Sequence, residues 1–464
     1  MDGLTEALIT DLSKISGLRV TSQRSVLQYK DAHKPANEIA RELDVDSVLE
    51  GSVLREGGRV RVTAQLVDAR ADRNLWAESY EREMDSLLLL ESEIARAVAA
   101  GVKVRLNPQE ERRLADVRKV NPATYQLYLK GMHWLHKSSM QDTVKGLDYL
   151  HKALELDPAD PLTHAGLAQG YLEQAHGSEA REDSLEKSKA AARTALKLDP
   201  TNSEAAATLG FIQGYMDWNW DEAFNTINQS LDANPSMPMA YYHRAWFSVL
   251  FGRMEEAIAD HRAAQRVDPF NPLHTSWLGE LYRMDGRPDL AIAEARKAID
   301  MAPLFPPGYY VLSLAHQDQG RHQEAITALS KAVETAPRWR WALVPAYVKA
   351  GRVAEARQLL GELQKQKPSP WNAFWSIVSH SALGEYDEAF RWADYRPHHI
   401  WTAWLRVLSW GGLEGMRLDP RFPALLRRMN LPPPGQIAPR PGSRRAAAPG
   451  LQMTPLIPAQ PYRS

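Results

Sequence analysis

A fixed spacing in the middle of the chain limits what it can fold into. Between Pro238 and Pro337, three positions recur at a step of 34 residues: a glycine, an alanine five residues later, and a proline. These positions are Gly252, Gly286 and Gly320; Ala257, Ala291 and Ala325; and Pro269, Pro303 and Pro337. A repeat of this length is typical of helix pairs that stack on their neighbours, because one pair cannot bury its apolar face alone. The spacing predicts a mainly α-helical superhelix.

The residues around each repeat indicate where its helices begin and end. Asp268-Pro269 ends one helix, since proline disfavours the α conformation in the residue before it. Asn271 then caps the next helix, and Pro272 fits its first turn. We expect the repeated glycines to lie in turns with positive φ, and small residues such as Gly279 to lie where the helices of a pair cross.

These features together resemble the tetratricopeptide repeat. The residues that carry the resemblance are Leu278-Gly279-x-x-Tyr282, Ala291, Ala298 and Pro303. The resemblance implies an array over residues 122–403 with about eight helix pairs, lengthened by a polar insertion within Glu173–Asp183. We expect residues 404–430 to cap the last apolar face. Residues 431–464, rich in proline and arginine, predict a disordered tail.

The first 106 residues differ in pattern and predict a small α/β domain. Helices are expected over Gly3–Ile15, from Pro35 onward and over Leu87–Val102, and strands over Leu18–Ser22, Ser47–Leu54, Arg59–Val67 and Asn74–Tyr80. Gly57-Gly58 supplies the turn of a hairpin between two of these strands. Residues 107–121 are charged on all sides and predict a linking helix.

Five short runs in this region resemble the TolB-type amino-terminal domain of bacterial signalling proteins. They are Asp2–Leu8, Ile39–Leu43, Val48–Leu54, Arg61–Val67 and Leu75–Tyr80. Members of that family begin with a strand ahead of the Asp-Gly pair, whereas this sequence has Met1 beside it. We expect a late start or a fragment rather than a sheet that lacks a strand, because unpaired backbone groups along a sheet favour self-association.

The same resemblance implies a wider context. In that family the domain and the helical repeats after it often lie downstream of a DNA-binding winged helix, a nucleotide cyclase or a protein kinase. In some members a membrane span precedes this region. None of these output domains is part of this sequence.

Composition excludes several classes of site. Lys and Arg number 56 against 57 Asp and Glu, so the net charge of −1 gives no general attraction to nucleic acid or anionic lipid. Without cysteine the chain has no disulfide, zinc-thiolate site or cysteine nucleophile. It has no apolar run of about 20 residues for a membrane span, and no signal peptide. We expect a cytoplasmic protein, or a periplasmic one if an upstream membrane span is missing.

No motif predicts catalysis, a cofactor or a bound metal. His133 and His136 lie one helical turn apart without a third ligand at matching spacing, and His398-His399 follows a turn. Ser184-Leu-Glu-Lys187 has the spacing of an acyl-enzyme motif but lies in a polar insert without partners. We expect a protein that is not an enzyme.

The first helix of each pair lines the concave wall of a tetratricopeptide superhelix, so aligning the repeats on their glycines predicts the groove residues. They are Phe211, Tyr215, Tyr242, Trp246, Glu280, Arg283, Tyr310 and Gln317. Aromatic and arginine side chains are frequent anchors of a bound peptide, and packing between repeats is the alternative role. Tyr242 and Trp246 stand where a clamp for a C-terminal carboxylate would need Lys and Asn. We expect Trp246→Ala to weaken partner capture without unfolding the array.

Two functions follow from these observations. The first is a non-enzymatic scaffold that binds a protein or peptide on its concave face in bacterial signalling. The second is the sensory half of a transcription regulator, nucleotide cyclase or kinase whose output domain lies upstream of Met1. The genomic sequence ahead of Met1 would distinguish them.

Overall fold

The computed structural model describes residues 2–30, 34–56, 59–83, 87–115, 121–137, 140–176, 183–366, 369–395, 402–407, 412–433 and 435–436. Several sequence-based expectations fall outside these residues. They concern the Gly57-Gly58 turn, His398-His399, the centre of the insertion in Glu173–Asp183, the end of the linking helix, and most of the tail over residues 431–464.

A three-stranded antiparallel sheet forms the centre of the amino-terminal domain. β1 (Ser47–Glu56), β2 (Arg59–Asp68) and β3 (Arg73–Glu83) lie side by side in chain order. The register of β1 and β2 places Glu56 opposite Arg59, so the expected hairpin is confirmed. Alternate residues of β2 from Val60 to Leu66 are buried, because successive side chains of a strand point to opposite faces.

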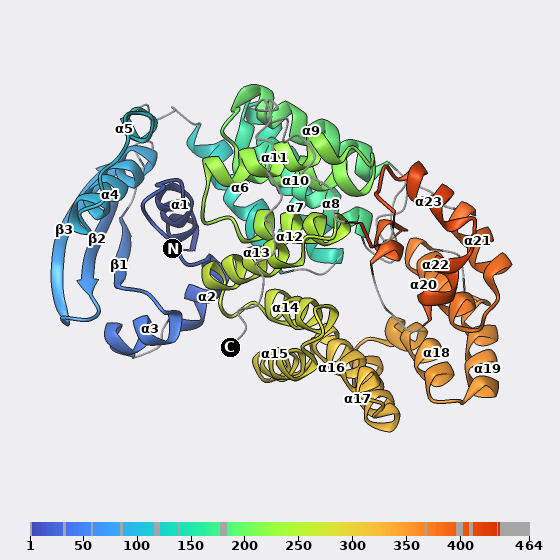
Figure 1. Cartoon of the computed structure of the whole chain (residues 1–464). Coiled ribbons are helices and arrows are strands. Elements are labelled where there is room, and N and C mark those ends of the chain that lie inside the picture. The colour runs from blue at the N-terminus through green and yellow to red at the C-terminus, as the bar shows by residue number, and fades with distance from the viewer. Residues whose placement is uncertain are drawn as a thin grey trace, which may run out of the picture.

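Helices cover one face of this sheet (Figure 1). The helices of the domain are α1 (Asp2–Ser13), α2 (Gln23–Val26), the 3₁₀ helix η1 (Leu27–Tyr29), α3 (Ala36–Leu43) and α4 (Leu87–Gly101), and α5 (Pro108–Ala115) follows them. The core lies between α1, α4 and the sheet, where Leu90 and Ile94 pack with Val62 and Leu66. The prediction of a small α/β domain is confirmed.

The expected strand over Leu18–Ser22 is wrong. This segment has no strand partner among the described residues and instead runs along the loops of the helical array. The backbone N–H of Val20 donates to Ser236 Oγ at 3.0 Å, and that of Ser22 donates to the carbonyl of Val267 at 2.8 Å. Its alternating side chains fit an extended backbone, but its hydrogen bonds go to the repeats and not to the sheet.

Eight helix pairs follow in the described part of the chain, as expected. They are α6 (Pro122–Leu135) with α7 (Met140–Leu156), α8 (Pro161–His176) with α9 (Ser184–Leu198), α10 (Ser203–Tyr215) with α11 (Trp220–Ala233), α12 (Pro238–Leu250) with α13 (Met254–Val267), α14 (Pro272–Met284) with α15 (Pro288–Met301), α16 (Pro306–Asp318) with α17 (His322–Thr335), α18 (Arg340–Lys349) with α19 (Val353–Leu363), and α20 (Pro370–Ala382) with α21 (Tyr386–Tyr395). The two helices of each pair pack on each other and on the next pair. The predicted superhelix of helix pairs is confirmed.

The local signals of the repeat also behave as expected. Gly252, Gly286 and Gly320 lie in the turns between paired helices at φ values of 78°, 74° and 72°. A side chain at these positions would be strained, so the glycines are required by the backbone. The side chain of Asn271 caps α14 by accepting a hydrogen bond from Leu273 N, and Pro272 begins that helix.

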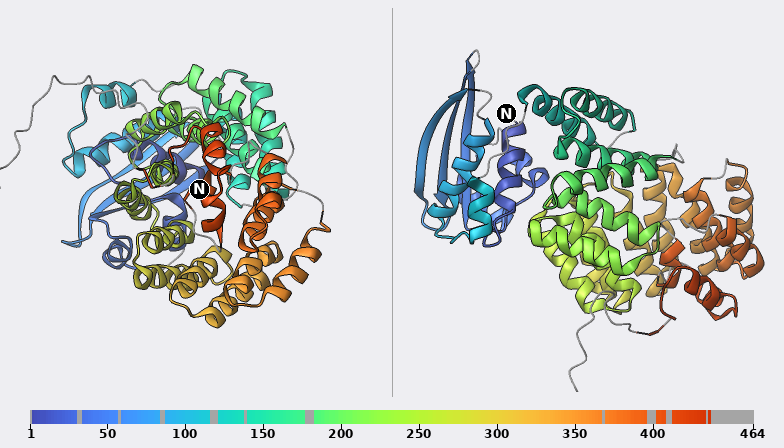
Figure 2. Two further views of the ribbon diagram at one scale, coloured as in Figure 1. Left: turned by 45° about the vertical axis from the view of Figure 1, so that its right-hand side comes forward. Right: turned by 90° about the horizontal axis from the view of Figure 1, so that it is seen from above.

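The array curves so that its carboxyl-terminal elements return to its earlier helices (Figure 2). These elements are the 3₁₀ helix η4 (Thr402–Arg406), α22 (Leu413–Leu418) and α23 (Phe422–Arg428), and another 3₁₀ helix, η3 (Pro337–Trp339), precedes α18. Phe422, Leu425, Leu426 and Met429 are buried in one core with the repeats. The carboxyl-terminal end of the array is therefore held against its middle by packing as well as by the chain.

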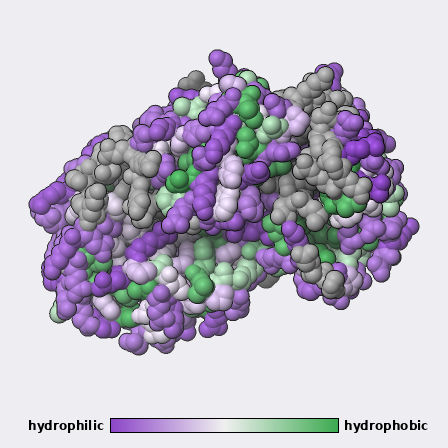
Figure 3. Space-filling model, turned by 180° about the vertical axis from the view of Figure 1, so that it is seen from behind, coloured by the Kyte–Doolittle hydropathy of each residue, from purple (hydrophilic) through white to green (hydrophobic). Residues whose placement is uncertain are grey.

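The surface gives no sign of a membrane-spanning element. None of the helices in the described segments has both the length and the apolar run that a membrane crossing needs. The face seen in Figure 3 is largely hydrophilic, with smaller hydrophobic patches between the polar side chains.

Candidate functional site

The candidate site is the surface formed by the first helices α10, α12 and α14, which we call the inner face. Four aromatic rings meet on it: Tyr215 at the end of α10, Trp246 in α12, Trp277 in α14 and Trp404 in η4. Trp246 and Trp404 stack with 4.9 Å between ring centroids and an interplanar angle of 21°. Trp277 and Tyr215 meet Trp404 edge-on at 6.3 and 6.0 Å. Stacked and edge-on contacts are both favourable for aromatic rings.

A second aromatic group continues this surface along the array. Tyr310 of α16 lies 4.9 Å from Trp339 and 6.0 Å from Trp375 of α20, measured between ring centroids. Trp371 lies 5.5 Å from Trp339. Burial raises the pKa of Tyr310, and that of Tyr215, well above the ordinary value, so both phenols stay neutral.

A buried ion pair lies between the two aromatic groups. Arg283 and Glu280 are one turn apart on α14 and are 5% and 0% exposed. The Nε and Nη2 atoms of Arg283 each donate to a carboxylate oxygen of Glu280 at 2.8 Å, and Nη1 donates to Asp318 Oδ2 at 2.7 Å. Burial alone would lower the pKa of Arg283, but the two carboxylates raise it above its ordinary value.

The carboxyl-terminal residues make hydrogen bonds to the same side of the array. Trp220 Nε1 donates to the carbonyl of Met429 at 2.7 Å, and Asn430 Nδ2 donates to the carbonyl of Trp218 at 3.1 Å. Arg406 is buried and donates to the carbonyls of Pro432, Pro433 and Gln436, at 2.7, 2.9 and 3.0 Å. Burial lowers the pKa of Arg406 to about 10. The bonds of Arg406 join η4 to Pro432, Pro433 and Gln436.

The structure places most of the predicted groove residues in the interior and not on an open wall. Six are buried, Phe211, Tyr215, Trp246, Glu280, Arg283 and Tyr310, while Tyr242 and Gln317 are partly exposed. The prediction put all of them on or near the first-helix surface, and each does belong to a first helix. Their burial has a physical reason. The neighbouring first helices, together with η4 and residues 412–433, cover that surface.

Sequence reasoning missed Trp277 and Trp404 as members of this cluster. Trp277 is 6% exposed and Trp404 is 4% exposed. The repeat period contains a signal for Trp277. This residue lies on the first helix of its pair, one turn before Glu280 and further from Arg283 on the same helix. Trp404 has no such signal, since it lies after the last regular repeat and reaches the inner face only through the curvature of the whole array.

Tyr242 lies among three buried histidines. Its ring centroid is 5.4 Å from that of His243, 5.3 Å from His261 and 5.9 Å from His274. Burial lowers the pKa of His261 well below its ordinary value and that of His274 to about 4. Both imidazoles are therefore neutral at neutral pH. Tyr242 serves as packing between α12, α13 and α14 as well as reaching the surface.

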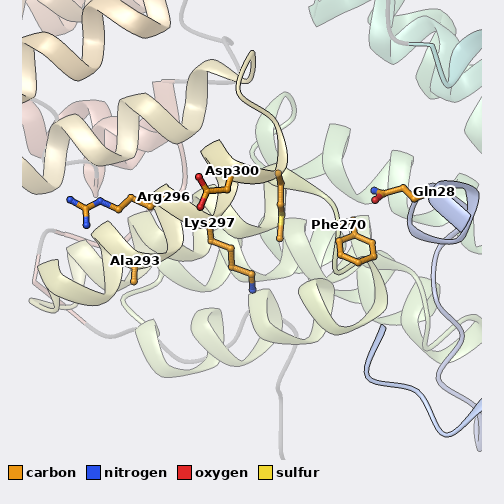
Figure 4. Close-up of a pocket in the computed structure, with 7 residues that line it drawn as sticks. Gln28, Phe270, Ala293, Arg296, Lys297 and Asp300 are labelled. Atoms are coloured by element: carbon orange, nitrogen blue, oxygen red, sulfur yellow. The ribbon is translucent and has the colours of Figure 1, made fainter. Parts of the chain in front are cut away.

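The α/β domain is attached at a second location. The hydroxyls of Ser22 and Ser25 both donate to Asp268 Oδ1, the second at 2.8 Å. The rings of Tyr29 and Phe270 pack with 6.2 Å between centroids. Beside this joint is an open pocket of about 600 Å³. It is lined by Gln28, Phe270, Ala293, Arg296, Lys297, Asp300 and Met301, of which Figure 4 shows Gln28 approaching from the α/β domain and the others from the repeats.

The residues considered for catalysis or metal binding have ordinary structural surroundings. The Ser184 hydroxyl is buried at the start of α9 and donates to Gln174 Oε1 at 3.0 Å. His133 packs on Trp134, and burial lowers the pKa of His136. Across the described ranges, no three His, Asp or Glu side chains lie close enough together to hold a metal ion.

Comparison with known families finds matches in both parts of the chain. Residues 1–97 match the second domain of the HilA/YgeH-like transcriptional regulators. Tetratricopeptide-repeat families match residues 219–272, 259–306 and 278–338, and residues 318–381. The predicted tetratricopeptide array is confirmed. The resemblance of the amino-terminal domain to the TolB type stays a prediction.

One curated relative matches part of the chain. A putative adenylate cyclase 3 of Rhizobium meliloti (strain 1021) is 32% identical over 219 residues, which are 46% of this chain and 37% of the cyclase. The chain thus matches little more than a third of the length of that relative.

Two solved structures match parts of the chain at low sequence identity. A tetratricopeptide repeat protein from Parabacteroides merdae is 16% identical, with 60% of this chain and 94% of that chain covered at a TM-score of 0.35. The Cut9–Hcn1 hetero-tetramer of the APC/C is 17% identical, with 74% and 63% covered at a TM-score of 0.43.

Proposed function

Because the chain carries a tetratricopeptide-repeat array joined to a small α/β domain, we propose that it is a non-enzymatic scaffold that holds a protein or peptide partner in bacterial signalling. A stack of helix pairs offers an extended curved surface, and repeat proteins use such surfaces for binding. The observation that carries the proposal is the aromatic inner face of α10, α12 and α14. Tryptophan and tyrosine are common among the residues that contribute most to protein interfaces.

The predicted groove residues take different parts in this proposal. Tyr242 and Gln317 are partly exposed and are the members that a partner reaches directly. The buried members support this surface from the interior. Trp246 and Tyr310 each pack within one of the two aromatic groups, and the Glu280–Arg283 pair lies between these groups. Gln317 has its amide 3.3 Å from Ser313 Oγ, so it is oriented along α16.

A matched pair of variants tests the proposal. Gln317→Arg adds bulk and charge to the first helix α16, whereas Gln323→Arg makes the same change at an exposed position of the second helix α17. The full-length chain is used to capture proteins from lysate of its source bacterium after chemical cross-linking, with the amounts quantified by mass spectrometry. We expect a partner whose recovery falls at least about tenfold with Gln317→Arg alone, a loss of about 1.4 kcal/mol in binding free energy. A partner recovered equally with both variants would place binding elsewhere.

A second candidate function is the sensory half of a larger regulator. Two observations favour it: the match of residues 1–97 to a domain of transcriptional regulators, and the partial match to a putative adenylate cyclase. In this function the repeats would sense a partner, and the α/β domain would pass the signal to a cyclase, kinase or DNA-binding output domain. An in-frame output domain encoded ahead of Met1 would support it, and a stop codon directly upstream would end it.

The compartment is part of the same proposal. We place the protein in the cytoplasm, and in the periplasm if a membrane span is encoded upstream. Fractionation of the source cells followed by immunoblotting distinguishes the two.

A further inference from the structure

The inner face is covered by residues from the carboxyl-terminal part of the same chain. Trp404 stacks on Trp246, and the carbonyl of Met429 accepts a hydrogen bond from Trp220. These contacts join residues far apart in the chain, since Trp220 and Met429 differ by 209 in number. The helix pairs between them are folded, so the curvature of the array brings the two sides of the contact together.

The covering segment has the composition of a bound peptide. All five residues of η4, Thr402–Arg406, are buried, and the Trp404 indole enters between the rings of Trp246, Trp277 and Tyr215. The guanidinium of Arg406 donates to the backbone carbonyls of Pro432, Pro433 and Gln436, which follow it in the chain. The Trp404 indole stacks on Trp246 and makes edge-on contacts with Trp277 and Tyr215. Buried aromatic side chains of this kind contribute most of the binding energy at many interfaces.

The segment is bound in two different ways at its two sides. Toward the last pair it is held by ion pairs, Arg421 Nη1 to Asp387 Oδ1 at 2.8 Å and Arg428 Nη1 to Asp394 Oδ1 at 2.7 Å. Toward the inner face it is held by the hydrogen bonds at Trp220 and Asn430, by a polar contact between Trp404 and Tyr215, and by aromatic packing. Phe422, Leu425 and Leu426 of α23 are also buried, in one core with the repeats.

We propose that the inner face is a docking site for a tryptophan-bearing segment of a partner protein, and that η4 closes this site by placing Trp404 in it. This inference rests on the proposed function and specifies its partner. The partner segment carries an indole followed by an aliphatic residue, as in Trp404-Leu405, and competes with the chain's own segment. The tethered segment has a high local concentration, commonly in the millimolar range for flexible links, so the intact chain binds the partner weakly.

The competition predicts which variant gains binding. Removing the Trp404 side chain leaves the walls formed by Tyr215, Trp246 and Trp277 in place but removes their occupant. The apparent affinity for an added segment then rises in proportion to the fraction of molecules whose site is open. The effect is specific to Trp404, because Trp371 belongs to the other aromatic group and contacts Trp339.

A peptide titration tests this inference on the full-length chain. The probe is a fluorescein-labelled peptide with the sequence of residues 402–407, Thr-Ala-Trp-Leu-Arg-Val, and its control has alanine for tryptophan. Fluorescence anisotropy measures binding to wild type, Trp404→Ala and the matched control Trp371→Ala. We expect Trp404→Ala to bind the tryptophan peptide at least about tenfold more tightly than the other two proteins, and no protein to bind the alanine peptide. Equal binding by all three proteins, or binding by none, would overturn the inference.

Two further measurements keep the test decisive. Circular dichroism checks that Trp404→Ala is folded, and if it is not, Trp404→Phe replaces it with an expected smaller gain. Sedimentation velocity of wild type checks for exchange of the segment between two copies. A wild-type dimer that Trp404→Ala abolishes would overturn a partner's segment as the occupant, because a second copy of this chain would then fill the site. If the peptide fails while Gln317→Arg still loses a cellular partner, this inference falls and the scaffold function stands.

Discussion

The indole of Trp246 is fully buried, and two separate parts of the chain bury it. Its face packs on Trp404 of the carboxyl-terminal segment, and Trp277 of the next first helix meets its edge. The expectation that its removal would leave the fold intact therefore needs revision. A side chain enclosed in this way contributes to stability through the area it removes from water and the contacts it makes.

We expect Trp246→Ala to destabilise the array by about 3–5 kcal/mol, the usual cost of removing a large buried aromatic side chain. Urea denaturation followed by circular dichroism measures the change. Leu304→Ala is the control, because Leu304 is 79% exposed and its truncation should change stability by no more than about 0.5 kcal/mol. Equal midpoints for Trp246→Ala and wild type would show that the ring is not part of the core.

The buried Glu280–Arg283 pair gives a prediction of its own. Glu280→Gln leaves the Arg283 cation in the interior with only the exposed Asp318 as a charged partner, and we expect a loss of about 3–5 kcal/mol. Asp318→Asn makes the same type of change at a carboxylate that is 44% exposed, and leaves Arg283 paired with Glu280. The loss there should be no more than about 1 kcal/mol. Thermal denaturation of both variants measures these losses. A lower melting temperature for Asp318→Asn than for Glu280→Gln would show that Glu280 is not the main partner of Arg283.

The sequence period identified the helix on which each of these residues lies, but not its exposure. The 34-residue step places Trp246, Glu280 and Tyr310 on first helices because the step is a property of each pair. The exposure of each side chain depends on which other residues pack against its helix. For Trp246 that is Trp404, which belongs to no repeat and lies far along the chain, so no local pattern could indicate it.

At the scale of elements, the packing of α12, α13 and α14 encloses neutral histidines. Burial lowers the pKa of His274 to about 4 and that of His261 well below its ordinary value of 6.5. The native state therefore binds fewer protons than the unfolded chain at mildly acidic pH. The stability contributed by the neutral form is fully present above pH 6.5 and is lost as the pH falls from 6.5 toward 4.

We expect the free energy of unfolding to fall over this pH range more steeply in wild type than in His274→Leu. The difference is on the order of 3 kcal/mol, from about 1.4 kcal/mol for each pH unit of pKa shift. Urea titrations at several pH values measure it. Leu304→Ala is the control, since Leu304 is exposed and carries no titratable group, so this variant should keep the pH dependence of wild type. Parallel curves for wild type and His274→Leu would contradict the prediction.

The elements differ in how far local sequence determined them. Helix limits followed from capping residues and turn glycines, which act within a few positions, and the β1–β2 hairpin followed from alternation and a glycine pair. Leu18–Ser22 has the same alternation, yet the expected strand was wrong. Alternation specifies an extended backbone, whereas the partner of its hydrogen bonds is set by the docking of the α/β domain on Ser236 and Val267.

At the scale of the whole molecule, two contacts between distant segments organise the protein. The α/β domain docks on the loop at Asp268, and η4 with residues 412–433 returns to the inner face. Both contacts place a segment outside the repeat pattern against the middle of the array. The fold class could be predicted because the repeats propagate from neighbour to neighbour. The closure could not, since it depends on the summed curvature of many pairs.

The central claim is that the carboxyl-terminal segment lies on the inner face in solution, and a distance measurement tests it most directly. The chain has no cysteine, so Asp221→Cys together with Arg427→Cys introduces two unique sites for spin labels at exposed positions. These positions adjoin Trp220 and Met429, whose Nε1 and carbonyl oxygen are 2.7 Å apart. Pulsed electron resonance should give a single narrow distribution at short distance. A broad distribution at long distances in the intact protein would show that the segment does not cover the inner face.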